Sequence, residues 1–254
     1  MDLQLKAKTA LVTGASAGIG RAIAKALAAE GVKVCVAARR HNLLEELARE
    51  IVAEGGVEPE IALIDLYVDG APARLAQEAR RRLGHIDILV NAAGGAVDAP
   101  DQWLGAPEET WVRALTLNYA QVRQLTLAVI PGMIDQQWGR VINVTGKAEP
   151  SHLNGTTPAK VAVHGFMKGL SREVARHGIT VNSIPPGQFV TEQTQRRHTD
   201  EQRRQFIERE IPIGRYGKPE ELAYLAVALA SPRACYITGN VIHVDGGQHR
   251  FALS

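Results

Sequence analysis

This chain has few cysteines, few aromatic residues and no large excess of charge of one sign. Among 254 residues there are two cysteines, Cys35 and Cys235, aromatic side chains make up 5%, and the formal net charge is +2. Two separated cysteines indicate neither a disulfide framework nor a metal site, so we expect a reduced, cytoplasmic protein without a metal. A nucleic-acid binder would concentrate far more positive charge, so we expect no nucleic-acid partner.

Long hydrophobic runs are also missing. No apolar stretch reaches the roughly 18 residues that a membrane-spanning helix needs, so we expect no membrane association. The opening "MDLQLKAKTALVTG" has an acid at position 2 and leads directly into a predicted strand, unlike a secretion signal. Hydrophobic and charged residues, at 45% and 22%, are present in ordinary globular proportions. We therefore expect one domain over residues 1–254.

The sequence does contain a regular alternation of short β-branched runs and longer stretches of helical period. We expect Asn42 to cap the helix in "NLLEELAREIVAEGG", and Gly31 and Gly55 to follow the ends of the first two helices. The strand-like runs are almost continuously hydrophobic, as strands covered by helices on both faces must be. This order predicts an α/β protein with a single doubly wound parallel β-sheet flanked by helices, of the Rossmann type. The predicted strands are 9–14, 32–38, 60–66, 86–94, 139–146, 179–187 and 240–247.

A glycine-rich turn, "TGASAGIGRAIAKAL", follows the first predicted strand and opens into a predicted helix. Gly14 permits a tight turn, and Gly18 and Gly20 allow the helix N-terminus to approach a pyrophosphate, whose charge the backbone N–H groups stabilise. The spacing differs from the general G-x-G-x-x-G fingerprint, and a glycine cluster alone is weak evidence. The strand before it and the helix after it favour a dinucleotide site.

The end of the second predicted strand should select the cofactor. A site for the unphosphorylated cofactor has Asp or Glu there to accept from the ribose 2′-hydroxyl. This chain has Ala38 at that position, followed by Arg39 and Arg40. Because a guanidinium pairs bidentately with a phosphate, we expect NADP(H) to be preferred over NAD(H), with Arg39 as the contact. The alternative is that one of the two arginines is an ordinary surface residue.

These motifs together resemble the short-chain dehydrogenase/reductase family, over essentially the whole chain. "TGASAGIG", "NAAG", Asn118 in "LTLNYA", Lys160, "VNSIPPG" and "HVDGG" occur in the family's order, and "IPIGRYGKPEELA" with "YITGNVIHVDGG" is similar to the 3-oxoacyl-[acyl-carrier-protein] reductase branch. The resemblance implies a hydride transfer between a nicotinamide and a small-molecule carbonyl or alcohol. It also implies a homo-oligomer, commonly a tetramer, and a substrate lid at 188–212.

The resemblance also implies roles for individual residues. Lys160 would hold the nicotinamide ribose, and Asn118 would hold a water in the proton relay. The other implied cofactor residues lie at the pyrophosphate, adenosine and nicotinamide ends of the site. They are Gly14, Ser16, Gly18, Ile19 and Gly20, then Asp65, Leu66, Asn91, Ala92, Ala93 and Gly94, and finally Pro186, Gly187 and Thr191.

Two positions depart from the family pattern. "NVTG" has Gly146 where the family has its active-site serine, with Thr145 just before it, and Thr156 stands four residues before Lys160, where the family has tyrosine. The pKa of a tyrosine is about 10, whereas that of a threonine hydroxyl is close to water's value of about 15.7. The difference of about 5 units corresponds to about 7 kcal/mol, so Thr156 is not a substitute acid.

The predicted start of the helix that carries Lys160 gives a second argument about Thr156. Proline is tolerated in a helix only in the first turn, preferably at the first position. Pro158 therefore favours Thr157 as the N-cap. Thr156 would then lie outside the helix and point elsewhere.

Other proton donors lie in the loop "TGKAEPSHLNG" (145–155). Lys147 or His152 could donate a proton and Glu149 could relay it, and a positioned acid accelerates a reaction by about 10²–10⁴-fold. Equally, Lys147 and Glu149 could pair on the surface. His164, further along the chain, is interpreted as a packed or paired residue rather than a catalytic one.

Three functions therefore stay open. The first is an NADP(H)-dependent oxidoreductase that interconverts a carbonyl and an alcohol with an altered proton relay. The second is a catalytically degenerate NADP(H)-binding protein, and the third is a lyase- or hydrolase-like enzyme that uses Lys147 and Glu149. Retention of Asn118 and Lys160 favours the first.

Overall fold

The computed structural model describes residues 2–97, 102–147, 152–192, 194 and 199–249. Six parallel strands form one sheet: β1 Thr9–Thr13, β2 Lys33–Ala38, β3 Glu60–Leu63, β4 Ile88–Asn91, β5 Gly139–Val144 and β6 Ile179–Ile184. The helices are α1 Gly18–Ala29, α2 His41–Ala53, α3 Ala71–Leu83, α4 Glu108–Leu115, α5 Gln121–Asp135, α6 Thr156–Val174, α8 Asp200–Glu210 and α9 Pro219–Ala230.

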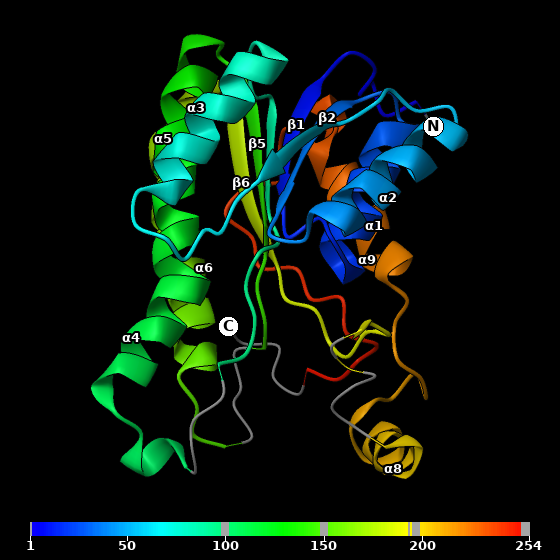
Figure 1. Ribbon diagram of the computed structural model, residues 1–254, viewed down its shortest axis with the longest axis vertical. Coiled ribbons are helices and arrows are strands. Elements are labelled where there is room, and N and C mark those ends of the chain that lie inside the picture. Colours follow the sequence, from blue (N-terminus) through cyan, green and yellow to red (C-terminus); the bar gives the residue numbers. More distant parts are fainter. Residues whose placement is uncertain (1, 98–101, 148–151, 193, 195–198, 250–254) are drawn as a thin grey trace.

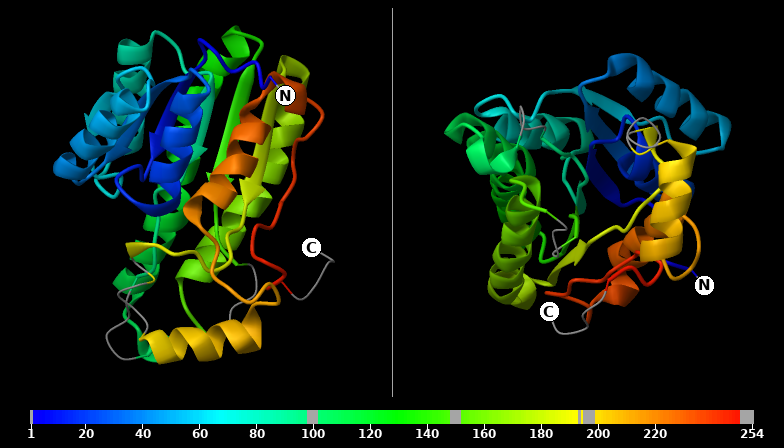
Figure 2. Two further views of the ribbon diagram at one scale, coloured as in Figure 1. Left: turned by 90° about the vertical axis from the view of Figure 1, so that its right-hand side faces the viewer. Right: turned by 90° about the horizontal axis from the view of Figure 1, so that it is seen from below.

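The sheet has the order β3-β2-β1-β4-β5-β6 and is covered by helices on both faces (Figure 1 and Figure 2). One apolar cluster lies between the sheet and α1, α2 and α9, and a second lies between the sheet and α3, α5 and α6. This arrangement confirms the prediction of a parallel sheet flanked by helices. Among the described residues, no helix is both long and apolar enough to cross a membrane.

Both glycines predicted at helix ends are confirmed. Gly31 and Gly55 directly follow the C-cap residues of α1 and α2, with φ of +79° and +85°, a backbone region that favours glycine. The N–H of Gly31 donates to the Ala28 carbonyl at 3.0 Å, and the N–H of Gly55 donates to the Val52 carbonyl at 3.0 Å. These bonds satisfy carbonyl groups that the helix itself leaves unpaired.

The predicted cap of α2 is wrong. The helix begins at His41 with Arg40 at the N-cap, so Asn42 lies inside the first turn. The physical reason is the short connection, because β2 ends at Ala38 and the chain turns into the helix within two residues.

The predicted strand at 240–247 is not a regular strand in the structure. The segment runs beside the end of β6 and makes two isolated parallel bridges, from Ser183 to Val241 and from Pro186 to Val244. Pro186 and its neighbour Pro185 have no N–H to donate, so a continuous ladder cannot form there.

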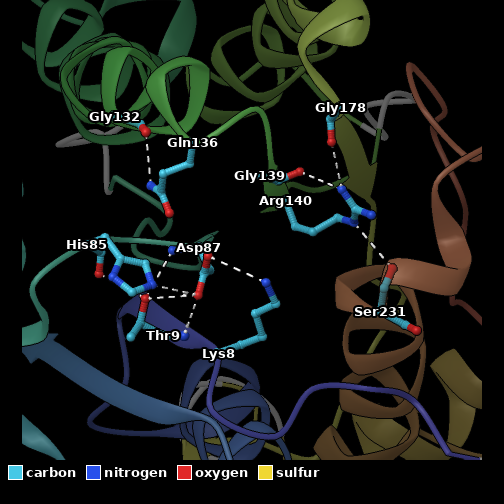
Figure 3. Close-up of polar contacts among 10 residues, drawn as sticks. All are labelled: Lys8, Thr9, His85, Asp87, Gly132, Gln136, Gly139, Arg140, Gly178 and Ser231. Atoms are coloured by element: carbon cyan, nitrogen blue, oxygen red, sulfur yellow. Dashed lines mark hydrogen bonds and ion pairs between the residues drawn. The ribbon is translucent and has the colours of Figure 1, made fainter.

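Polar side chains lie at the sheet's amino end, opposite the glycine-rich turn. Figure 3 shows the contacts of two of them, Asp87 and Arg140, which form two parts. In the first, the nearly buried carboxylate of Asp87 accepts from the Thr9 backbone N–H at 2.9 Å and lies 3.2 Å from the His85 ring and 3.8 Å from the Lys8 ammonium. Because the Thr9 N–H is buried, this carboxylate replaces the water that the N–H would otherwise bind.

The second part is the guanidinium of Arg140, which is 1% exposed. It donates to the carbonyl oxygens of Gly139, Gly178 and Ser231 at 2.8, 3.0 and 3.2 Å (Figure 3). These three carbonyls come from β5, the turn before β6 and the end of α9. A single buried cation therefore joins three segments that are distant in the sequence.

We expect Asp87→Ala to lower the free energy of unfolding by about 2–4 kcal/mol, because it leaves the Thr9 N–H buried without an acceptor. Urea denaturation at neutral pH measures the change. Asp69→Ala, at an exposed position, is the matched control and should stay within about 0.5 kcal/mol of the parent. Equal losses in the two variants would contradict the role given to Asp87.

Candidate active site

A cleft of about 780 Å³ opens at the carboxyl ends of the central strands. The strand order reverses between β1 and β4, and parallel sheets bind ligands at such a switch point. Most of the residues implied for the cofactor line this cleft. They are Gly14, Ser16, Gly18, Ile19, Gly20, Arg39, Asp65, Leu66, Ala92, Ala93, Gly94, Lys160, Pro186, Gly187 and Thr191.

The glycine-rich turn between β1 and α1 is shaped for a close backbone approach. Gly14 and Gly18 have φ of +67° and +56°. A Cβ on Gly20 would lie 2.5 Å from the Gly14 carbonyl oxygen, so the turn has no room for a side chain there. The N-cap of α1, Ala17, makes no side-chain hydrogen bond to the first N–H groups of the helix. An anion such as a pyrophosphate fits this helix end, because those N–H groups need an acceptor.

The two arginines after β2 both line the cleft, but their contacts differ. Arg40 donates to the Ser16 hydroxyl at 3.3 Å and pairs with Glu192 at 2.8 Å. The Arg39 side chain is 73% exposed, and its guanidinium lies 3.8 Å from the Asp65 carboxylate. Arg39 is therefore held more loosely and can turn toward a phosphate without breaking a short ion pair.

Lys160 and Thr145 meet at the inner end of the cleft. The Lys160 ammonium donates to the Thr145 carbonyl oxygen at 2.8 Å. A Cβ on Gly146 would lie 2.6 Å from Cδ of Lys160, so a serine at 146 would push the stem of the lysine aside. Burial lowers the pKa of Lys160 to about 8, because the charged form loses its hydration.

Thr156 begins α6, which corrects the prediction that it lies outside the helix. The side chain of Asn154, and not that of Thr157, provides the cap, by accepting from the Thr157 N–H at 2.7 Å. Pro158 is tolerated because N–H groups in the first turn have no helical acceptor. The Thr156 hydroxyl accepts from the Val97 N–H at 3.4 Å, and Thr156 is not among the residues that line the cleft.

Asn118 lies behind the wall of the cleft, in a π-helical turn at Thr116–Ala120. Its amide nitrogen donates to the carbonyl oxygens of Gly95 and Ala114, each at 3.0 Å, and its oxygen accepts from the Gly95 N–H at 3.0 Å. The side chain is therefore occupied with the backbone at Gly95, which itself lines the cleft.

A second, small cavity of about 10 Å³ lies next to the cleft, with room for about one water. Asn118, Asn91, Thr145 and Lys160 are among its lining residues. Asn91 does not line the main cleft, and its side-chain oxygen is buried with no hydrogen-bond partner among the described residues. A water in this cavity would satisfy that oxygen beside Lys160.

Lys147, in the loop after β5, does not line the cleft. Its ammonium lies 5.4 Å from the ring centre of Phe206 on α8. His152 is exposed, and Glu149 lies outside the described residues. Proton donation from this loop stays a prediction.

Sequence reasoning missed several residues of the site. Arg113 and Gln121 line the cleft, as does Tyr67, and the guanidinium of Arg113 lies 5.9 Å from the Tyr67 ring centre. His164, interpreted from the sequence as a packed or paired residue, is paired in the structure, with Nε2 of the ring 2.8 Å from the Thr145 hydroxyl. Its position four residues after Lys160 places both on one face of α6.

We expect Lys160→Met to increase stability at pH 7 while it removes the amine from the site. The folded pKa of about 8 lies below the ordinary 10.5, so the cost of keeping the lysine charged is fully present below pH 8 and disappears as the pH rises toward 10.5. That cost is at most about 3 kcal/mol, and loss of the hydrogen bond to Thr145 offsets part of it.

The measurement is the difference in unfolding free energy between Lys160→Met and the parent at pH 7 and pH 10. We expect the variant to be more stable by about 1–2 kcal/mol at pH 7 and the advantage to vanish by pH 10. Lys168→Met, on the exposed side of α6, is the control. An advantage independent of pH would contradict the assigned burial of the Lys160 charge.

Comparison with known proteins agrees with this geometry. A family model described as enoyl-(acyl carrier protein) reductase matches residues 14–249. The 3-oxoacyl-[acyl-carrier-protein] reductase of Escherichia coli (strain K12) is 36% identical over 251 residues, which cover 97% of this chain and 99% of the relative. The chain belongs to the short-chain dehydrogenase/reductase family. The corresponding reductase of a Synechocystis species is 39% identical over 257 residues, with 97% and 99% coverage.

Two solved structures share the fold and contain different cofactors. A 7α-hydroxysteroid dehydrogenase in complex with NADH has a TM-score of 0.90 at 31% identity, with 98% of this chain and 97% of that chain covered. The actinorhodin polyketide ketoreductase with NADPH has a TM-score of 0.88 at 30% identity, with 96% and 98% covered. The likeness therefore supports the fold and does not by itself select between NADH and NADPH.

Proposed function

We propose that the chain is an NADP(H)-dependent oxidoreductase that interconverts a small-molecule carbonyl and an alcohol. The observation that carries the proposal is one cleft lined by the glycine-rich turn, the arginines after β2 and Lys160. When bound, the nicotinamide cofactor supplies or accepts the hydride. The similar proteins named as 3-oxoacyl-[acyl-carrier-protein] reductases support a carbonyl compound as the substrate.

Each end of the cleft has a proposed role. The uncapped start of α1 binds the pyrophosphate, Arg39 binds the 2′-phosphate, and Lys160 holds the nicotinamide ribose. The adenosine and the nicotinamide amide contact the remaining lining residues. These are Asp65, Leu66, Ala92, Ala93 and Gly94 for the adenosine, and Pro186, Gly187 and Thr191 for the amide.

The proton relay in this proposal differs from that of a tyrosine-containing site. Thr156 is too weak an acid and makes its hydrogen bond outside the cleft, to Val97. The small cavity beside Asn118 and Lys160 has room for about one water and supports a route through water. Lys160, with its pKa lowered to about 8, is positioned to exchange a proton with that water.

A second candidate is an NADP(H)-binding protein without redox turnover. Threonine at position 156 favours it, because its hydroxyl accepts from the Val97 N–H and is too weak an acid to protonate the substrate. The third candidate, a lyase- or hydrolase-like enzyme that uses Lys147 and Glu149, has weaker support. Lys147 faces Phe206, and Glu149 lies outside the described residues.

We also propose that residues 188–212, which include α8, act as a substrate lid within one domain. The contact of Lys147 with Phe206 supports this, since it joins the loop after β5 to α8. We further propose that the chain forms a homo-oligomer, commonly a tetramer in this family. We also propose that it is cytoplasmic and has no nucleic-acid partner.

Calorimetric titration with NADPH and with NADH tests the proposal first. Tight binding of NADPH with weak binding of NADH is the expected result, and binding of neither would overturn the proposal. NADPH oxidation with a small 3-oxoacyl ester, ethyl acetoacetate, then separates the first two candidates. Binding without any oxidation across a panel of ketones would support the binding protein.

A further inference from the structure

Thr145 is held by hydrogen bonds at all three of its polar groups. Its backbone N–H donates to the Ile184 carbonyl at 3.1 Å, and its carbonyl accepts from the Lys160 ammonium at 2.8 Å. Its hydroxyl lies 2.8 Å from Nε2 of His164. The residue is 3% exposed and lines the cleft, so its side chain has a fixed direction there.

One helix makes two of these three contacts. Lys160 and His164 are four residues apart on α6 and share a helix face, one binding the backbone of Thr145 and the other its side chain. Burial, together with smaller effects of the nearby His243 and Lys160, lowers the pKa of His164 to about 4. His243 in turn stacks on His249, with ring centres 3.9 Å apart. The His164 ring is therefore neutral at neutral pH and carries one ring hydrogen.

The position of that hydrogen decides what the Thr145 hydroxyl can do. If the hydrogen is on Nδ1, Nε2 accepts a hydrogen bond, and the Thr145 hydroxyl donates its hydrogen to His164. If it is on Nε2, the hydroxyl oxygen accepts and its own hydrogen remains available to a second acceptor. Among the described residues, no other hydrogen-bond partner of the Thr145 hydroxyl is present.

We propose that His164 is a positioning residue whose Nε2–H donates to the Thr145 hydroxyl and thereby directs the threonine hydrogen toward the substrate oxygen in the cleft. This inference rests on the proposed oxidoreductase function. Thr145 then stabilises the negative charge that develops on the carbonyl oxygen as hydride arrives. Because the threonine keeps its proton, its high pKa is no obstacle to this role.

The first test needs no substrate. Nitrogen-15 NMR of histidine-labelled protein distinguishes the two tautomers, and the His164 signals are those that vanish in His164→Leu. We expect the Nε2–H tautomer in the parent and a changed Nε2 shift in Thr145→Val. An Nδ1–H tautomer in the parent would overturn the proposal.

The second test is kinetic, with NADPH and ethyl acetoacetate. We expect His164→Leu to lower kcat by about 10- to 100-fold, because removal of an oriented donor costs about 10²–10³-fold and removal of its support costs less. The Kd of NADPH should stay within about twofold. His164→Gln retains an N–H near the position of Nε2 and should keep most of the activity.

A double variant separates positioning from general damage. In the Thr145→Val background, His164→Leu should have no further effect on kcat, since His164 acts only through the hydroxyl. Independent, multiplying losses would overturn the proposal. If the parent binds NADPH but oxidises none, the proposed function fails, and the tautomer measurement alone decides the state of the pair.

Discussion

The variant Thr156→Tyr is expected to reduce a ketone substrate about 10²–10⁴-fold faster than the parent, the range typical of a positioned general acid. Thr156 is the first residue of α6 and stands four residues before Lys160, so the two share a helix face. A tyrosine hydroxyl there has a pKa of about 10, which the lysine ammonium lowers further. The expected gain comes from this acid, because the cofactor residues are unchanged.

The matched control is Thr156→Phe, which adds the same ring without the hydroxyl. Thr157→Tyr is a second control, because neighbouring helical residues face different directions. The measurement is kcat and KM from NADPH absorbance with ethyl acetoacetate, between pH 6 and 9. A gain in kcat for tyrosine alone supports the missing acid, whereas equal rates in Thr156→Tyr and Thr156→Phe would contradict it.

The structural cost of this substitution should be small. It removes one hydrogen bond, from the Val97 N–H to the Thr156 hydroxyl at 3.4 Å, which is long for such a bond. Since typical bonds contribute about 1 kcal/mol, the variant should remain folded. A thermal melt beside the kinetic assay confirms that the comparison concerns folded protein.

The variant Arg39→Asp is expected to invert the cofactor preference. A hydrogen bond to a charged group contributes about 1.5–3 kcal/mol, so the loss of Arg39 should weaken NADPH binding by about 10- to 100-fold. The new carboxylate repels a 2′-phosphate and accepts from a 2′-hydroxyl, so NADH binding should tighten. Calorimetric Kd values for both cofactors measure the ratio, and an unchanged ratio would exclude Arg39 as the phosphate contact.

Arg40 provides the comparison for this experiment. It pairs with Glu192 at 2.8 Å and with Ser16 at 3.3 Å, so it joins the glycine-rich turn to the segment after β6. Arg40→Ala should therefore weaken both cofactors to a similar degree without changing their ratio. A selective loss of NADPH in Arg40→Ala would instead assign the 2′-phosphate to Arg40.

Much of the fold could be predicted because its signals are local. The glycines after α1 and α2 lie in left-handed conformations at the predicted ends, with φ of +79° and +85°. One failure occurred where distant partners decide the outcome. The segment 240–247 has the composition of a strand, but the prolines beside it, at 185 and 186, interrupt the ladder.

The candidate site also combines features that local sequence determines with features that depend on distant contacts. The sequence by itself determined the family, the parallel sheet, the glycine-rich turn and the pair of arginines, because each depends on the order and spacing of residues close together in the chain. Only the tertiary structure decided that Glu192 holds Arg40 and that His164 binds the Thr145 hydroxyl. These two contacts depend on how α6 packs against the end of β5 and on where the segment after β6 lies beside the glycine-rich turn, which no local pattern encodes.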